Sequence, residues 1–435
     1  MQRVEAKFNG RIAPESVKRP HPMTQTRRLK YVGFCIALCL TCASTLLAQD
    51  FNTLTNKPVI SVTGTPYFAD PTGKVDATNA IQSCINDTVT KRAVCALPAG
   101  TYMISGFGLT MPSQSSLYGF QNLGDASPSL VYYGDSTALT IGNCVDTSKL
   151  VYGVNLVNVS INQASGTTGE YGIQVCGLSE ANWDGLSVGN NSTTGYFTGA
   201  NIRFYDSAEI DLLNLTVTNS AYRPGTTGIL FDDVGHWGNA TITIHGGASG
   251  IFAFENALVC KSCINIAVRD ALIEGNDYGL LVDNSGWVSS GDALDNVNFE
   301  NTEFLTNDIP GPIHSKVLQV NSLGGAKLVV KNLVFRSTKW QLSGTSGVTF
   351  PVELNIPKTG PYSVFSLKLD TNSIDGANMA VVDSDNTLAS IFFTGENDIT
   401  EPDGITRPPD LHGMATVVDY ISLFGSTLPP RAMKP

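Results

Sequence analysis

A short apolar signature recurs through the middle of this chain at a nearly constant interval. Successive copies end 27, 29, 27, 29, 31 and 31 residues apart, at Ile161, Val188, Val217, Ile244, Ile273, Phe304 and Phe335. An interval of this size with strand-like contents indicates one supersecondary unit stacked on copies of itself. The repeat therefore predicts a solenoid before any single residue is interpreted.

A second series of apolar segments runs in phase with the first. Its segments begin at Ile173, Ile202, Ile229, Ile251 and Leu280. A third stretch lies between the two, so each unit carries about three short strands. Gly, Asn, Asp and Ser separate these strands and supply the positive φ angles and side-chain bonds that corners need. No helix-period pattern of useful length interrupts them. The pattern predicts an all-β fold, a parallel β-helix, over a sandwich or barrel, which would not keep one period through seven units.

The segment 70–105 differs from the repeats and predicts a cap. Asp76 is expected to cap a short helix whose apolar face holds Ala80, Ile81, Cys84 and Ile85. A helix there would cover the first coil, which otherwise presents unpaired backbone groups.

This segment also resembles the N-terminal motif of the pectate-lyase-like superfamily, in its rhamnogalacturonase/epimerase-type and tailspike-type members. The matching elements are Asp70, Gly73, Asp76, Ala80, Ile81, the run 97–102 and Ser105-Gly106. The resemblance implies a single-stranded right-handed parallel β-helix and, for many relatives, action on polysaccharide. The superfamily includes hydrolases, lyases, epimerases and proteins without known activity, so the chemistry must come from the site.

The ends of the chain predict a secreted protein. Residues 1–48 are typical of a signal peptide, with basic Arg27, Arg28 and Lys30 before an apolar core and Ala48 before the cut; Met23 is the expected true start. We expect residues 49–110 to form the cap and first coil, 111–396 the β-helix, and 397–435 a C-terminal cap with a Pro-rich tail. Secretion or a periplasmic location follows, with no membrane anchor in the mature form.

The charge of the mature chain narrows its partners. The first 48 residues hold eight Lys/Arg and two Asp/Glu, which leaves 19 basic and 36 acidic residues and a net charge of −17. Such a surface argues against nucleic acid and anionic membranes, and makes a polyanionic substrate less favourable. A polysaccharide is the expected partner, and no oligomeric state is favoured.

Six cysteines remain after the signal peptide, an even number in a compartment where disulfides persist. We expect Cys84 to pair with Cys95, and Cys144 with Cys176 about one coil away. Cys260 and Cys263 form a CxxC. Because no second CxxC or His pair completes a zinc site, a structural disulfide or two free thiols is favoured over a redox or metal role.

Counting from the second series places acids in one register on three coils: Asp206, Asp233 and Glu255. Stacked carboxylates can hold one member protonated and one ionised, which glycoside cleavage requires. The predicted catalytic residues are Asp206, Asp232, Asp233 and His236, the last as a proton relay. The predicted substrate-binding residues are Arg203 for a carboxylate, Tyr205 and Trp237 for stacking on sugar rings, and Glu255.

An Asp followed one coil later by Asp-Asp is similar to the acid cluster of polygalacturonase-type hydrolases. The chain departs from that pattern on the following coils, where GIFAFEN stands in place of Gly-His-Gly and GLLVDNS in place of Arg-x-Lys. Hydrolysis is preferred to a lyase reaction because Lys and Arg are sparse near these acids. No cofactor or metal is expected, with Ca²⁺ needed only for a lyase. The alternatives are structural acids at corners and a non-catalytic, glycan-binding surface or adhesion protein.

Overall fold

The computed structural model describes most of the chain from residue 57 onward. The described ranges are 57–120, 127–190, 192–232, 238–283, 294–305, 316–321, 329–342, 351–355, 364–375, 381–383, 389–394, 397–400, 406–407, 411–412 and 420–421. The predicted signal peptide, with its start at Met23, lies outside these residues, as does most of the predicted C-terminal cap. Residues 58–435 form one compact unit, which is described here.

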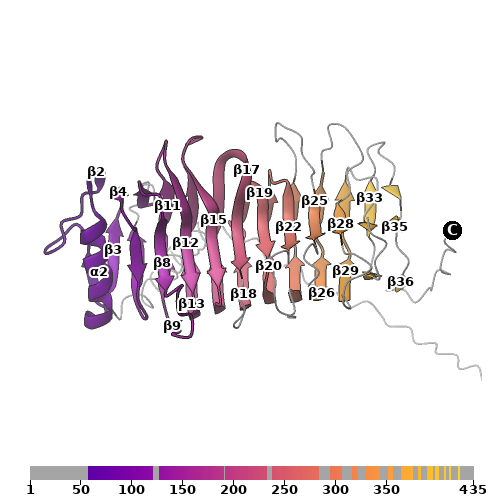
Figure 1. Cartoon of the computed structure of the whole chain (residues 1–435), viewed down its shortest axis with the longest axis horizontal. Helices are drawn as coiled ribbons and strands as arrows, with labels where there is room; N and C mark the ends of the chain where they lie inside the picture. The colour runs from indigo at the N-terminus through magenta and orange to yellow at the C-terminus, as the bar shows by residue number, and fades with distance from the viewer. Residues whose placement is uncertain are drawn as a thin grey trace, which may run out of the picture. The chain divides into compact units, whose positions relative to one another are not determined.

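Three ladders of parallel strands build this unit, and each strand pairs with its counterpart one coil away (Figure 1). Ladder A is a 14-stranded sheet. It contains β1 Val59–Ser61, β3 Val94–Pro98, β6 Ser116–Phe120, β9 Val151–Tyr152, β10 Asn155–Val157, β13 Leu178–Asp184, β16 Ala208–Leu213, β18 Asn239–His245, β20 Cys263–Arg269, β23 Leu294–Glu300, β26 Val329–Arg336, β29 Val364–Asp370, β32 Ala389–Thr394 and β36 Tyr420–Ile421.

Ladders B and C together form a 22-stranded sheet, because the long strands β17 Thr216–Asp232 and β19 Gly250–Cys260 take part in both. Ladder B also contains β2 Thr72–Asp76, β4 Thr101–Ile104, β7 Ser129–Tyr132, β11 Ser160–Gln163, β14 Ser187–Asn190, β21 Leu272–Glu274, β24 Glu303–Leu305, β27 Lys339–Gln341, β30 Ser373–Asp375, β33 Asp398–Thr400 and the antiparallel β34 Thr406–Arg407. Ladder C also contains β5 Leu109–Met111, β8 Thr137–Gly142, β12 Thr168–Cys176, β15 Tyr196–Tyr205, β22 Tyr278–Asp283, β25 Lys316–Asn321, β28 Val352–Asn355, β31 Val381–Asp383 and β35 Leu411–His412.

The all-β parallel helix predicted from the repeat is therefore confirmed, although two details of its register were wrong. Ile244 and Phe335 belong to ladder A, not to the ladder of Ile161 and Val188. Ile251 belongs to ladder B, where it pairs with Val217. The three strands of a coil share one composition, so a shift from one ladder to the next leaves the apolar signature intact.

The interior is a continuous column of apolar side chains. Phe204 lies between Trp183 and Phe231, with ring centroids 6.2 and 5.6 Å apart, and Phe299 stacks on Phe335 at 4.9 Å. These five side chains are almost completely buried. Since each coil places its side chains directly over those of the preceding coil, like residues stack along the whole column.

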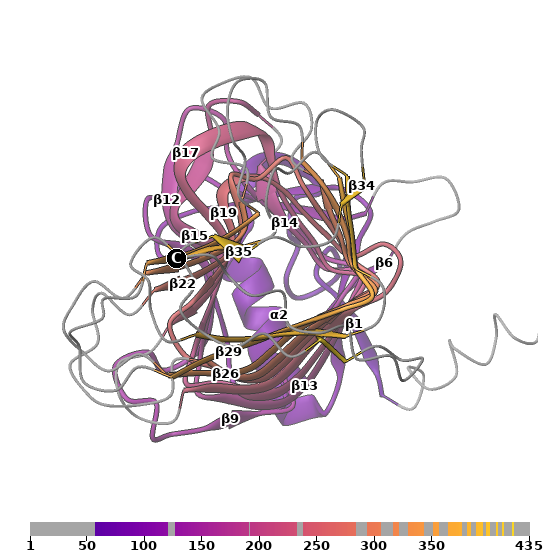
Figure 2. The ribbon, with the colours of Figure 1, turned by 90° about the vertical axis from the view of Figure 1, so that its right-hand side faces the viewer.

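One helix in the described part of the chain, α2 Thr78–Lys91, covers the N-terminal coils. Its buried face holds Ile81, Cys84 and Ile85, which join the central core. Viewed along the stack, α2 lies across the outline of the coils (Figure 2). The predicted capping helix is confirmed, but its N-cap residue is Ala77; Asp76 instead accepts the backbone N–H of Thr78 at 2.8 Å.

All three cysteine pairs form disulfides: Cys84–Cys95, Cys144–Cys176 and Cys260–Cys263. The first two confirm the expected pairs, and the third decides between the two structural alternatives for the CxxC. Three disulfides indicate an extracellular or otherwise oxidising compartment. Within the described residues, no helix is long and apolar enough to cross a membrane.

Candidate functional site

The outward face of ladder C carries most of the residues that the sequence singled out. Ile202 and Phe204 of β15 point into the core. Because side chains alternate along a strand, Arg203 and Tyr205 point outward. The same alternation on β17 places Leu230 and Asp232 outward, paired with Arg203 and Tyr205 respectively. We call this surface, over β12, β15, β17, β19, β22, β25 and β28, the C face.

Arg203 lies at the centre of the N-terminal half of the C face. Its guanidinium carbon is 5.2 Å from the ring centre of Tyr171 and 5.0 Å from that of Tyr205. Its Nε and Nη2 donate to the same Asp232 oxygen, Oδ2, at 2.9 and 2.7 Å. The two tyrosine rings and the carboxylate therefore fix a single guanidinium, by cation–π contact and by charge-assisted hydrogen bonds.

Asp232 has a second cationic partner, Lys261, whose Nζ lies 3.1 Å from Oδ1. Lys261 reaches this position because Cys260 pairs with Phe231, so the next residue on each strand is also adjacent. The Lys261 backbone N–H donates to the Phe231 carbonyl, and the Cys260–Cys263 disulfide closes the corner. Asp232 is only 9% exposed, and Arg203 and Lys261 balance its charge within the protein.

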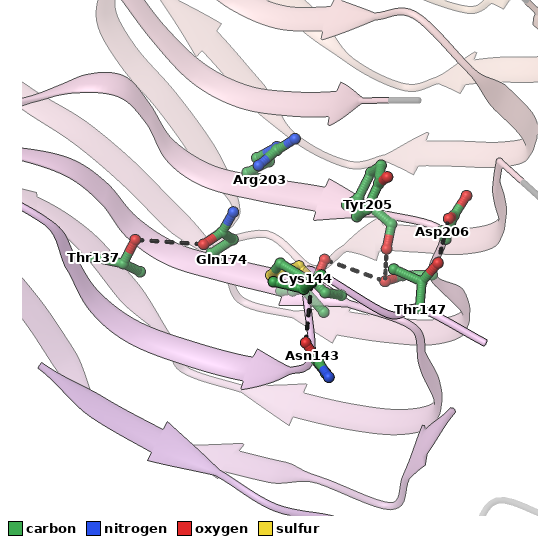
Figure 3. Close-up of a disulfide and its surroundings, with 12 residues drawn as sticks. Thr137, Asn143, Cys144, Thr147, Gln174, Arg203, Tyr205 and Asp206 are labelled. Atoms are coloured by element: carbon green, nitrogen blue, oxygen red, sulfur yellow. Dashed lines mark hydrogen bonds between the residues drawn. A yellow bond between two sulfur atoms is a disulfide. The ribbon is translucent and has the colours of Figure 1, made fainter. Parts of the chain in front are cut away.

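Asp206 occupies a corner and is 4% exposed. Its φ of 49° lies in the left-handed region, as does the 64° of Gly177 on the preceding coil, which confirms that the chain turns there. Asp206 Oδ2 accepts the Thr147 hydroxyl at 2.8 Å and Oδ1 accepts the Gly238 N–H at 3.1 Å. Figure 3 shows Thr147 turned toward Asp206 beside the Cys144–Cys176 disulfide. The Thr147 hydrogen bond anchors the 143–150 loop to this corner.

The register predicted for Glu255 was wrong. Ile229 pairs with Leu258, so Ser262, four positions after Leu258, takes the place in the register that was predicted for Glu255. Glu255 lies instead where β19 passes from ladder B to ladder C, and its Oε2 accepts the Gly225 N–H at 2.5 Å. The error arose because Ile251 was counted as the start of a ladder C strand.

Glu255 lies at this corner together with several residues that were not predicted as site residues from the sequence. The Tyr222 hydroxyl lies 3.5 Å from Asp277 Oδ2, and Lys316 Nζ lies 5.8 Å from the ring centre of Tyr278. Lys316 also forms an ion pair with Glu353. The residues share a corner because Tyr278 and Lys316 are register partners. If Leu258 had been assigned to ladder C from the sequence, the register would have revealed this group.

Burial and the acids at this corner act together on its tyrosines. Burial raises the pKa of Tyr278 to about 12, with further contributions from the negative charges of Asp277, Glu255 and Glu353. Burial, followed by Asp277 and Glu255, also raises the pKa of Tyr222 well above its ordinary value. Both phenols are therefore neutral hydrogen-bond donors at any physiological pH.

An apolar strip connects the group around Arg203 and Asp232 with the group around Glu255 and Tyr278. Leu230 and Val259 point outward but are only 9% and 6% exposed, and they pack with Ala200, Tyr171 and Leu281. The C face thus combines aromatic rings, an apolar strip and bonded polar groups, which is the chemistry that carbohydrate surfaces share.

The remaining predicted site residues, Asp233, His236 and Trp237, lie outside the described residues. Of the predicted site, the structure brings together Arg203, Tyr205 and Asp232, places Asp206 at the adjoining corner, and separates Glu255 from that register. Over the described ranges, no group of three or more His, Cys, Asp or Glu is arranged to hold a metal ion. The catalytic roles stay predictions.

Comparison with other proteins shows similarity in structure without similarity in sequence. No family model matches the chain, and no curated protein matches it. A solved structure titled DFA-IIIase from Arthrobacter chlorophenolicus A6 in complex with GF2 is similar over 81% of this chain and 86% of its own, with a TM-score of 0.52 and 10% identity.

Two further solved structures resemble this one. Geobacillus virus E2 ORF18 matches over 87% of this chain, with a TM-score of 0.50 and 12% identity; this chain spans 64% of the length of that protein. A hyperthermoactive exopolygalacturonase from Thermotoga maritima matches over 84% of this chain and 95% of its own, with a TM-score of 0.45 and 11% identity. The likeness to the first two of these three structures shows the fold alone, a right-handed parallel β-helix.

Proposed function

We propose that this protein is a secreted polysaccharide-active enzyme that binds its glycan along the C face and hydrolyses a glycosidic bond there. The observation that carries the proposal is the group of Tyr171, Arg203, Tyr205, Asp232 and Lys261, in which bonded charges and two aromatic rings share one outward surface. The fold supports it by analogy only, since unrelated functions occupy one fold.

The chemistry assigned to Asp232 follows from its partners. Glycoside hydrolysis requires one carboxylate that is ionised and one carboxyl group that donates a proton. Asp232 is held in place by Arg203 and Lys261, and it is assigned the role of base or nucleophile. Asp233, next in sequence, is the proposed proton donor, with His236 as its relay and Trp237 as a stacking residue. Asp206 is proposed to act as a positioning residue through the 143–150 loop.

A second candidate is glycan binding without cleavage, as in a surface or adhesion protein. It is favoured by the same contacts, because an Asp232 that is fully engaged by Arg203 and Lys261 also serves as a rigid part of a binding surface. The two candidates share the C face and differ only in whether bonds are broken.

The test is reducing-sugar release, together with absorbance at 235 nm for unsaturated products, over a panel of plant and microbial polysaccharides. Hydrolysis produces reducing ends without the 235-nm signal, and a lyase produces both. We expect Asp232→Asn and Asp233→Asn each to lower the rate about 100-fold or more, which is typical for the loss of an acid or base. Asp206→Asn is expected to lower it by less than about tenfold.

Arg269→Ala is the matched control, because Arg269 is an exposed, ion-paired arginine on ladder A. Thermal unfolding of each variant separates loss of fold from loss of chemistry. Full activity in both Asp232→Asn and Asp233→Asn would remove the catalytic assignment. Binding to a glycan with no product from any polysaccharide would favour the non-catalytic candidate.

A further inference from the structure

Three cations of the C face are already paired with acids of the protein. Arg203 and Lys261 share Asp232, and Lys316 pairs with Glu353. The described cations of this face, with the corner beside it, are Arg203, Arg223, Lys261 and Lys316. The described acids are Glu170, Asp232, Glu255, Asp277, Asp283 and Glu353. A substrate carboxylate would have to displace an internal acid from three of these four cations.

The fourth cation, Arg223, is also engaged. Its guanidinium carbon lies 4.0 Å from the ring centre of Tyr196, and its Nη2 donates to the Thr193 carbonyl at 2.5 Å. It stands beside Gly225, whose N–H binds the carboxylate of Glu255. An anionic sugar that approached Arg223 would therefore also meet the negative charge of Glu255, since the register partner of Arg223 is Phe254, the residue next to Glu255.

The hydrocarbon surface of the C face suits an uncharged ring. Beside the buried Leu230 and Val259, the partly buried Tyr171 and Leu281 offer apolar surface to the carbon-bound hydrogens of a sugar.

We infer that the glycan bound at the C face is uncharged or cationic, and that polyuronates are rejected. Glu255, Asp277 and Glu353 are the specificity-determining acids. Glu255 and Asp277 add negative charge at this corner, and Glu353 occupies Lys316, which an anionic sugar would otherwise bind. This inference rests on the proposed function, since it concerns the substrate of the same face.

The test compares two polymers that differ only in charge: polygalacturonate and its fully methyl-esterified form. Binding to the full-length secreted protein is measured by calorimetry at low and at high salt, alongside a panel of neutral polysaccharides. We expect at least one neutral glycan to bind about tenfold more tightly than polygalacturonate, and the ester to bind more tightly than the free acid. Raising the salt should weaken this preference for the ester, because salt screens the repulsion.

Two charge-removing variants test whether Glu353 is responsible for the difference in binding between polygalacturonate and its ester. Glu353→Gln removes one acid and releases Lys316, so polygalacturonate binding should strengthen by up to about fivefold while binding of the ester stays unchanged. Glu300→Gln removes the same charge from an ion pair on ladder A and should change neither. Tighter binding of polygalacturonate than of its ester would overturn the inference and leave the proposed function intact. No binding of any glycan would overturn the proposed function and the inference with it.

Discussion

The Arg203–Asp232 pair should contribute more to stability than the Lys261–Asp232 pair. Both Arg203 contacts are shorter than 3 Å, at 2.9 and 2.7 Å, and the two side chains are 16% and 12% exposed. Lys261 lies at 3.1 Å and is 34% exposed, so solvent screens its charge more strongly. Half-buried, charge-assisted bonds of the first kind contribute about 1.5–3 kcal/mol. Exposed pairs of the second kind contribute about 0.2–1 kcal/mol.

Double-mutant cycles measure these two couplings directly. The variants are Arg203→Met, Lys261→Met, Asp232→Asn and the two double variants that include Asp232→Asn, each unfolded in urea. The expected coupling is about 2 kcal/mol for Arg203 with Asp232 and below about 1 kcal/mol for Lys261 with Asp232. Equal couplings, or a larger value for Lys261, would refute the reasoning that burial decides the contribution of each ion pair.

Three further perturbations follow from the fold. Phe204→Ala, in a completely buried aromatic stack, should lower the free energy of unfolding by about 3–5 kcal/mol, whereas Phe107→Ala, at a side chain that is 90% exposed, should change it by less than about 0.5 kcal/mol in the same urea titration. Loss of the Cys144–Cys176 disulfide, which spans 32 residues, should lower the free energy of unfolding by about 3–4 kcal/mol. Loss of the Cys84–Cys95 disulfide, which spans 11 residues, should lower it by about 1 kcal/mol less. Double cysteine-to-alanine variants in the same urea titration check this order. Backbone and side-chain hydrogen bonds from Thr72, and backbone bonds from Val75 and Lys74, lower the pKa of Asp70 from 3.8 to about 2, so its stabilising effect is present above pH 3.8 and is lost as the pH falls toward 2. Thermal melts should therefore show a smaller loss of stability between pH 4 and pH 2 in Asp70→Asn than in the parent protein, and an equal loss would contradict this assignment.

The repeat predicted the architecture because one coil cannot bury its own apolar face. Stacking is the only way to cover Ile202, Phe204 and their counterparts, so a regular spacing of apolar strands required the solenoid that the structure has. The cap followed from the change of periodicity around Ile81 and Ile85. The cysteine pairs followed from their number and their spacing relative to one coil.

The candidate site was predicted only where the register was correct. Arg203, Tyr205 and Asp232 lie on strands whose spacing follows the repeat, and the structure places them in contact. Glu255 was misplaced because β19 crosses from one ladder to the next without a break, and composition alone cannot mark that crossing. Partner choice was also beyond the sequence: Lys261 and Thr147 reach their acids across coils, over separations that no local pattern reveals.

The central claim is that the C face binds the glycan, and a hydrogen-exchange footprint tests it most directly. The protein is labelled with and without an oligosaccharide of the polymer that the binding panel selects. We predict added protection in β12, β15 and the 227–232 part of β17, with no change in β13, β16 and β18 of ladder A. Protection confined to ladder A, or protection absent from β15 and β17 at saturating ligand, would contradict the account.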